Sequence, residues 1–286
     1  MERYDIAIIG TGPGGLEAAI TAKVRNKNVL LLGSKTSSLK VEKAHEILNY
    51  LGLPNVKGSD LQKAFLSHAE SMGVEITDDR VIAIYPLGDY FGIQARDGMY
   101  EASSIILATG VVMSKPYPGE NEFLGKGVSY CATCDAALYK DKVTAIIGSS
   151  PKEEEEANFM SEYASKVLYF PLYKEETSTN DKVKVIHETP KEILGDTIVH
   201  TLRTDQNDYT VDGVFVLREA VSPGQLLSGL ETSGPHVVVD INMTTNIPGV
   251  FACGDIAGTP YQYIKAAGQG NIAALSAVNY LTTLKK

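Results

Sequence analysis

The sequence contains no tryptophan, only three cysteines and no long apolar run. Three cysteines are too few for the disulfide framework of a small secreted protein. No segment reaches the roughly 20 apolar residues that a membrane-spanning helix needs. Basic residues are also scarce, because 26 Lys and Arg stand against 35 Asp and Glu and give a net charge of −9. This balance argues against nucleic acids and anionic membranes as partners.

Apolar side chains make up 44% of the 286 residues and charged side chains 21%, which excludes an intrinsically disordered chain. The length exceeds that of one ordinary domain and predicts two. The first residues lead directly into a strand-like segment, without the pattern of a signal or transit peptide. We therefore expect a cytoplasmic protein.

The acidic residues are concentrated in the middle of the chain. Residues 114–235 carry 12 basic and 20 acidic side chains, whereas residues 1–113 carry 11 and 13, and residues 236–286 carry 3 and 2. This distribution predicts a discontinuous domain formed by residues 1–113 and 236–286, with an acidic domain inserted between them. We expect the chain to pass from one domain to the other at two segments, called the crossings here. These are Met113–Gly119 and Leu230–Pro235, which are rich in turn-forming residues. A solvated acidic surface that only aids solubility is the alternative.

Two strand–helix–strand patterns support this division. Residues 4–10 and 28–33 are short apolar runs around a helical pattern at 14–24, and residues 142–148 and 166–170 repeat the arrangement. The fold class predicted is therefore α/β, with two Rossmann-like domains of the dinucleotide-binding type and the second inserted in the first.

The first pattern carries a glycine motif between its strand and its helix. Gly10, Gly12 and Gly15 have the spacing G-x-G-x-x-G, with Pro13 and Gly14 between the last two. Gly10 permits the turn, Gly12 lets the backbone approach a pyrophosphate, and Gly15 allows the helix to pack closely on the strand. This context predicts a dinucleotide-type cofactor at the start of the helix.

Two later strands end in matching turns. Ile105–Leu107 leads into Ala108, Thr109 and Gly110, and a second strand leads into Gly254 and Asp255. With the first motif, they resemble the flavoprotein disulfide reductases with two dinucleotide domains, in which such an aspartate contacts the flavin's ribityl side. The resemblance implies FAD as the cofactor. The acidic residue that often binds a ribose is missing, because Gly33-Ser-Lys follows the second strand, and each turn taken alone is also a common structural feature.

Two of the three cysteines form the motif Cys131-Ala-Thr-Cys134-Asp135, just before a predicted helix start. A helix N-terminus stabilises a thiolate and raises its reactivity, and Asp135 is a candidate proton donor and acceptor. A zinc site needs further Cys or His ligands and no second pair exists, so we expect no metal. A structural pair of thiols stays open at this point.

The Cys-Ala-Thr-Cys-Asp motif closely resembles that of the low-molecular-weight thioredoxin reductases, and the resemblance covers essentially the whole chain. It implies that Cys134 faces the flavin, that Cys131 attacks the disulfide of thioredoxin and that Asp135 handles protons. Asn49 and Gln262 match positions that contact the flavin. Tyr261 stands where that family usually has a basic residue, and Cys253 is interpreted as a buried packing residue.

The second glycine motif is broken. Gly148 is followed by Ser150 and Glu153, where the family that binds NADPH has a glycine and an alanine. Glu153–Glu156 crowd the first turn of the helix, where they would repel a pyrophosphate, although acidic residues also stabilise a helix start. Pro171–Lys174 replaces the basic cluster that would bind the 2′-phosphate. NADPH binding is therefore not expected.

This combination resembles the ferredoxin-dependent flavin thioredoxin reductases, which keep FAD and the Cys pair and lack the NADPH motifs. It implies a homodimer that takes electrons from ferredoxin and passes them to thioredoxin. An NADPH-dependent reductase with an atypical site and a flavin redox sensor without turnover are the alternatives. The expected docking face for ferredoxin carries six basic residues: Lys23, Arg25, Lys27, Lys35, Lys40 and Lys43. An ordinary solvated surface is the alternative interpretation of these residues.

Overall fold

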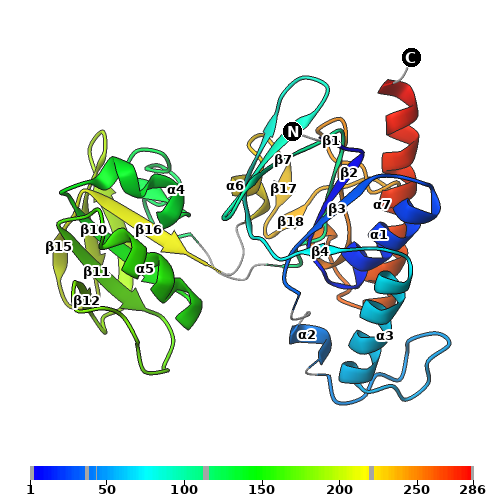
Figure 1. The fold of residues 1–286 in the computed structure, drawn as a ribbon, viewed down its shortest axis with the longest axis horizontal. Helices are drawn as coiled ribbons and strands as arrows, with labels where there is room; N and C mark the ends of the chain where they lie inside the picture. Colours follow the sequence, from blue (N-terminus) through cyan, green and yellow to red (C-terminus); the bar gives the residue numbers. More distant parts are fainter. Residues whose placement is uncertain (1–2, 36–38, 43, 112–115, 219–221, 285–286) are drawn as a thin grey trace. The chain divides into compact units, whose positions relative to one another are not determined.

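The chain forms two compact units. The contacts between Cα atoms place residues 1–113 and 222–286 in the first unit, and residues 114–221 in the second unit (Figure 1). Each unit is described by itself below. The computed structural model describes residues 3–35, 39–42, 44–111, 116–218 and 222–284.

The second crossing differs from the expected one at Leu230–Pro235, because residues 222–235 belong to the first unit. Helix α6 (Pro223–Leu226) packs against strand β5 (Val81–Pro86), and strand β17 (Thr232–Ser233) pairs with strand β18 (His236–Val237). These contacts attach the segment to the first unit although its composition is typical of a linker. In the expected first crossing, Met113–Gly119, residues 113–115 lie outside the described residues.

The first unit is built on a five-stranded, fully parallel sheet with the order β19-β8-β2-β3-β4. All four residues of β2 are buried, as expected for a strand covered on both faces. Helices α1 and α7 pack on each other beside this sheet (Figure 1). Small side chains of both helices, such as Ala18, Ala22 and Ala277, belong to the same buried cluster. The elements are β2 (Ile6–Ile9), β3 (Val29–Leu32), β4 (Ile76–Thr77), β8 (Ile105–Leu107), β19 (Val250–Ala252), α1 (Pro13–Val24), α2 (Leu39–Glu42), α3 (Gly58–Ser71), η3 (Gly254–Ala257) and α7 (Tyr263–Leu284).

A second, four-stranded sheet completes the first unit. Its order is β1-β7-β6-β5, with antiparallel pairing from β7 to β5 and one parallel pair at β1. Its strands are β1 (Arg3–Tyr4), β5, β6 (Phe91–Ala95) and β7 (Met99–Ala102).

The second unit repeats the parallel plan. Its five-stranded sheet has the order β12-β11-β10-β16-β9, with every pair parallel, and a separate antiparallel sheet has the order β13-β14-β15. The predicted α/β class with two Rossmann-like sheets is confirmed. The elements are β9 (Val128–Ser129), α4 (Ala132–Asp135), η1 (Ala136–Tyr139), β10 (Val143–Gly148), η2 (Pro151–Glu153), α5 (Glu154–Met160), β11 (Lys166–Pro171), β12 (Val183–Val185), β13 (Pro190–Gly195), β14 (Val199–Thr204), β15 (Asp208–Thr210) and β16 (Gly213–Leu217).

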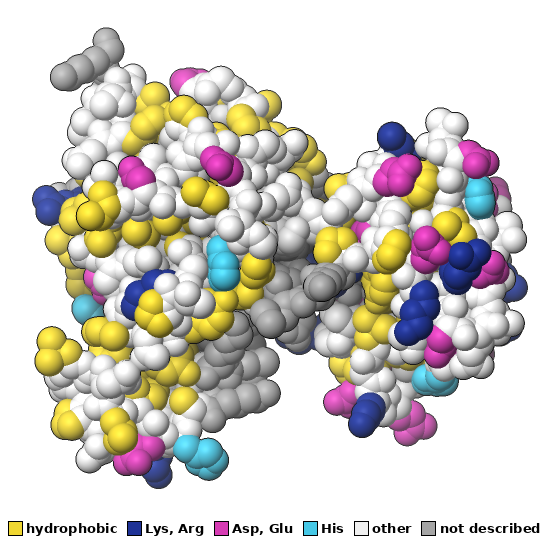
Figure 2. Space-filling view, turned by 180° about the vertical axis from the view of Figure 1, so that it is seen from behind, with side chains coloured by type: hydrophobic (Ala, Val, Ile, Leu, Met, Phe, Trp, Pro, Cys, Tyr) yellow, Lys and Arg dark blue, Asp and Glu magenta, His cyan; other side chains and the backbone are white. Residues whose placement is uncertain are grey.

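The two units differ in their surfaces. On the face drawn in Figure 2, charged side chains are denser on the second unit, and hydrophobic side chains are the more frequent kind on the first. Among the described residues, no helix has both the length and the apolar character needed to cross a membrane.

Candidate active site

The first glycine loop joins β2 to α1 and contains two glycines that the fold itself requires. Gly10 has a φ of 118°, and a Cβ there would lie 2.3 Å from the carbonyl oxygen of Ala108. A Cβ on Gly15 would lie 1.8 Å from the carbonyl oxygen of Gly10. Any side chain at either position would collide with backbone, so both glycines serve the packing of the helix on the sheet.

Gly12 is different, because a Cβ there would meet no atom within 4 Å. It caps α1, whose first helical residue is Pro13 and whose first turn contains no acidic side chain. The amide groups at this end have no partner within the helix, and their dipoles favour an anion. The loop therefore fits a pyrophosphate, with Gly12 as the glycine that leaves room for it.

The other two flavin motifs lie at the same edge of the sheet. Strand β8 pairs with both β2 and β19, all in parallel, so the turns that follow these strands emerge side by side. These turns hold Ala108–Gly110 and the pair Gly254 and Asp255. Gly110 has a φ of 71° and its Cβ position faces open space. The structure thus brings together three motifs that lie far apart in the sequence.

Asn49 and Gln262 also meet in the first unit. The Asn49 side-chain amide donates a hydrogen bond of 2.8 Å to the Gln262 side-chain oxygen, across 213 positions of sequence. Tyr261, which replaces a basic residue, pairs its hydroxyl with Nε2 of His236 at 2.7 Å. Tyr261 thereby gains a partner within the unit at the position where a charge was expected.

Lys265 was not predicted from the sequence. Its Nζ donates to the carbonyl oxygens of Gly254 (3.2 Å) and Gly258 and so closes the turn that presents Asp255. Burial lowers the pKa of Lys265, against the opposing effect of Asp255. The sequence feature that could have indicated this role is a lysine in the first turn of a largely apolar helix. Cys253, next to the same turn, is a buried free thiol whose pKa burial raises to about 12, in agreement with a packing role.

The four described basic residues of the expected docking face do not all lie together. Lys23, Arg25 and Lys27 lie at the C-terminal end of α1 and before β3, whereas Lys35 follows β3. The full length of β3 therefore separates them, and of these four residues Lys35 alone lies at the edge that carries the glycine loop. The side chain of Lys40 and all of Lys43 lie outside the described residues.

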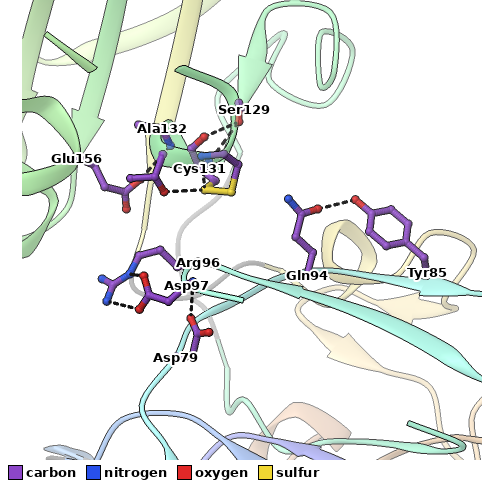
Figure 3. Close-up of a disulfide and its surroundings, with 11 residues drawn as sticks. Asp79, Tyr85, Gln94, Arg96, Asp97, Ser129, Cys131, Ala132 and Glu156 are labelled. Carbon is purple, nitrogen blue, oxygen red and sulfur yellow. Dashed lines mark hydrogen bonds and ion pairs between the residues drawn. A yellow bond between two sulfur atoms is a disulfide. The ribbon is translucent and has the colours of Figure 1, made fainter. Parts of the chain in front are cut away.

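Cys131 and Cys134 form a disulfide in the second unit (Figure 3). The sulfur of Cys131 accepts a hydrogen bond from the Cys134 amide (3.1 Å) and lies 3.3 Å from the Thr133 hydroxyl, and the Cys131 amide donates to Ser129 Oγ (3.2 Å). Cys131 is only 1% exposed, whereas Cys134 is exposed. The pair thus presents Cys134 to solvent and holds Cys131 in a hydrogen-bonded setting.

The helix at the cysteine pair starts earlier than predicted, because Cys131 itself is its N-cap. Helix α4 spans only Ala132–Asp135 and continues as the 3₁₀ helix η1. The contact of this short helix with the Cys131 sulfur is a hydrogen bond from one amide, that of Cys134. Asp135 is half-buried. Burial of the Tyr139 side chain and the nearby Asp135 carboxylate raise the pKa of Tyr139.

The second glycine loop is filled by side chains of its own unit. A Cβ on Gly148 would lie 2.2 Å from the hydroxyl of Tyr169. Ser150 and Glu153 form a capping box, in which the Ser150 amide (2.8 Å) and hydroxyl (2.6 Å) both donate to the Glu153 carboxylate. An internal carboxylate thus occupies amides that a bound phosphate would use.

Glu154 extends this network. Its carboxylate accepts hydrogen bonds from the hydroxyl of Tyr173 and from the amide of Ser178 (2.8 Å), and the hydroxyls of Tyr173 and Tyr169 lie 3.1 Å apart. Burial raises the pKa of Tyr169 to about 12 and also raises that of Tyr173. Tyr173 lies in the segment where a basic cluster was missing, and its side chain closes the loop instead.

The sequence predicts that Glu153–Glu156 crowd the helix start and repel a pyrophosphate, and the structure shows three of these four side chains buried. Glu153, Glu154 and Glu156 are buried and accept hydrogen bonds, and Glu155 alone is exposed. The acidic run is a set of internal acceptors because these side chains turn toward unpaired amides and hydroxyls of their own unit.

A buried ion pair was also missed. Arg218 forms a bidentate pair with Glu120, which is fully buried, with 2.7 Å between Nη2 and Oε2. Glu120 also accepts from the Tyr130 hydroxyl (3.2 Å) and the Tyr117 amide (2.8 Å). Burial and the Glu120 charge raise the pKa of Tyr130, the residue before Cys131. The pair ties together the two ends of the second unit, and a lone arginine after an apolar strand was its only sequence signal.

Comparisons with known proteins agree with this geometry. The family model described as pyridine nucleotide-disulphide oxidoreductase matches residues 4–270. A thioredoxin reductase from Aquifex aeolicus is 34% identical over 307 aligned positions, which cover 99% of this chain and 95% of the relative.

Two solved structures are similar over nearly the whole chain. A ferredoxin-flavin thioredoxin reductase from Clostridium acetobutylicum has a TM-score of 0.90 and 52% identity, covering 100% of this chain and 99% of the other. A thioredoxin reductase from Gloeobacter violaceus has a TM-score of 0.79 and 28% identity, covering 99% and 96%.

FAD is the cofactor of the matched family and of this chain. The residues of the first unit fit it, because the loop at Gly12 is open, the first turn of α1 lacks acidic side chains, and the turns with Gly110 and Asp255 lie at the same sheet edge.

Proposed function

Because this chain belongs to the pyridine nucleotide-disulphide oxidoreductase family, we propose that it carries electrons from reduced ferredoxin through FAD and the Cys131–Cys134 disulfide to thioredoxin. The coarser assignment is a flavoprotein disulfide oxidoreductase of the thioredoxin reductase type, and it follows from the relatives and from the disulfide. The finer assignment concerns the electron donor.

The filled second glycine loop is the observation that supports ferredoxin over NADPH. Tyr169 covers Gly148, Glu153 takes the amide of Ser150, and Glu154 holds Tyr173 in place. A dinucleotide would have to displace a buried hydrogen-bonded network, and it would meet buried carboxylates where it needs cations. The Clostridium acetobutylicum relative, whose name includes ferredoxin and flavin, supports the same choice.

In this proposal the first unit is the FAD-binding domain. Gly10, Gly12, Pro13, Gly14 and Gly15 hold the pyrophosphate side of the cofactor. The flavin, when bound, supplies the conversion between a one-electron donor and the two-electron chemistry of a disulfide. The remaining cofactor contacts are assigned to Asn49, Ala108, Thr109, Gly110, Gly254, Asp255 and Gln262.

The second unit is the redox-disulfide domain. Cys134 is the exposed member of the pair and is assigned to the flavin side, while Cys131 is assigned to attack thioredoxin and Asp135 to move the proton. Since Cys131 is buried in this structure, it must become accessible before it can reach a partner's disulfide. Reduction of the S–S bond supplies the thiol of Cys131 that the attack requires.

Steady-state thioredoxin reduction tests the proposed function. With a ferredoxin-reducing system, the enzyme should reduce many equivalents of thioredoxin, and with NADPH alone it should reduce almost none. Turnover with NADPH at a comparable rate would support the atypical NADPH-dependent enzyme. One stoichiometric reduction without turnover would support a redox sensor.

A homodimer and a cytoplasmic location are further parts of the proposal. Light scattering of the FAD-loaded protein should give twice the 30.8 kDa of one chain. Fractionation of cells that express the protein should place it with cytoplasmic enzymes.

A further inference from the structure

Glu156 is a buried acid next to the redox disulfide. It lies on α5, is 5% exposed, and accepts a hydrogen bond of 2.9 Å from the amide of Ala132 (Figure 3). Ala132 follows Cys131 directly, so only Cβ, Cα and the carbonyl carbon of Cys131 separate its sulfur from that amide. The Glu156 carboxylate on α5 therefore binds the backbone of Ala132 on α4, the residue that follows Cys131.

In the described part of the second unit, the charged groups near the disulfide lie on helix α4 and on the elements around it. Helix α4 packs against α5 and η1, and it carries Asp135 itself. On α5, Glu155 is exposed, while the carboxylate of Glu154 is bound to Tyr173 and Ser178. On η1, the raised pKa of Tyr139 keeps that side chain neutral.

In the neighbouring described loops, the positive charge of Arg218 is paired with the Glu120 carboxylate. The Glu153 carboxylate is bound to Ser150 at the start of η2, and Tyr130, which follows β9, is bound to Glu120. Among the described residues, Asp135 thus lies on helix α4 itself, and Glu156 accepts a hydrogen bond from its first residue.

We propose that Glu156 is a positioning residue of the redox pair, whose buried carboxylate fixes the Ala132 amide and disfavours a thiolate on Cys131 in the reduced enzyme. Reduction breaks the Sγ–Sγ bond with two electrons, which the flavin supplies in the established type of reaction. It yields two thiols when two protons are taken up from solvent, or one thiol and one thiolate when one is taken up. A nearby negative charge favours the form with two thiols. A reduced pair that is less stabilised by thiolate formation has a lower reduction potential. It is therefore the stronger reductant of thioredoxin.

This inference rests on the redox role proposed for the pair but does not depend on whether ferredoxin or NADPH is the donor. The test uses the FAD-loaded protein and Glu156→Gln, which keeps an oxygen acceptor for Ala132 and removes the charge. The protein is equilibrated with dithiothreitol at about pH 6 to 10, which spans the ordinary pKa of a thiol. This gives the midpoint potential of the disulfide at each pH. The slope of potential against pH halves above the pKa of the first thiol, because one proton fewer is taken up.

The pH at which this slope changes is called the break. We expect the break of Glu156→Gln to lie about one pH unit lower than that of the unmutated protein. The midpoint potential of Glu156→Gln at pH 7 should be higher. Glu155→Gln removes the same charge from the exposed side of the same helix and should leave the break unchanged. Glu156→Asp keeps the charge and should restore it, which separates the effect from loss of folding. A break in Glu156→Gln that coincides with the unmutated protein, or an equal shift in Glu155→Gln, would overturn the inference. If dithiothreitol cannot reduce the pair at all, the proposed function fails instead.

Discussion

The two glycine loops of this protein have the same topology and opposite contents. Each follows a parallel strand and precedes a helix. At the first loop, Gly12 faces open space and the helix start is free of acids, whereas at the second, Ser150 and Glu153 bond to each other over the helix start. The comparison indicates that side chains of the second unit make hydrogen bonds that the phosphates of a nucleotide would otherwise make.

The largest expected effect separates the two units chemically. Cys134→Ser removes the disulfide from the second unit and leaves the loop at Gly12 untouched, so thioredoxin reduction should fall to background while the donor still reduces the flavin. Steady-state turnover and flavin absorbance in the same sample measure both. Loss of flavin reduction together with turnover would contradict this separation of roles.

The glycines of the first loop should differ in what they support. Gly15→Ala forces a Cβ against the Gly10 carbonyl and should lower the free energy of unfolding by about 1–3 kcal/mol. Gly12→Ala meets no atom and should leave the stability of the FAD-free protein unchanged while weakening FAD retention. Urea unfolding of the apoprotein and FAD titration measure these effects. Equal destabilisation by both variants would refute the distinction.

The tyrosines that close the second loop should make stability sensitive to alkaline pH. The pKa of Tyr169 is about 12 in the folded protein, above the ordinary value of 10.0. Its neutral form therefore stabilises the fold fully below pH 10, and this contribution is lost as the pH rises toward 12. Unfolding free energies should fall by about 1–2 kcal/mol over that range. Tyr169→Phe should show a smaller fall, and an unchanged fall would exclude Tyr169 as its source.

The smallest expected effect comes from opening the capping box. Ser150→Gly combined with Glu153→Ala gives the second loop the glycine and alanine that NADPH-binding relatives have, and should lower the stability by about 1 kcal/mol. NADPH should still not reduce the flavin, because Tyr169, Tyr173 and Glu154 continue to fill the space. Chemical unfolding and anaerobic spectra measure the two outcomes. Rapid reduction of this variant by NADPH would make the capping box alone responsible.

Much of the fold was predictable because its signals are local. Strands such as Ile6–Ile9 and Val143–Gly148 are short apolar runs, and glycine spacing marks the turns after them. The cysteine pair was predictable for the same reason, since the disulfide closes over three positions.

The rest depended on tertiary contacts. The sequence placed Glu153–Glu156 on a helix start but did not reveal that three of these side chains turn inward, because their partners include Tyr173 and Ala132. Lys265 was missed because its acceptors are backbone carbonyls, which no residue pattern marks. The second domain crossing was misplaced because α6 makes its contacts with a strand far back in the chain.

Anaerobic reduction of the bound flavin by two donors is the most direct test of the difference between the loops. The protein is mixed in separate samples with excess NADPH and with reduced ferredoxin, and the flavin absorbance is followed by stopped flow. The account predicts rapid bleaching by ferredoxin and almost none by NADPH. Rapid bleaching by NADPH would contradict it, because the second loop would then bind the nucleotide that its side chains are argued to exclude.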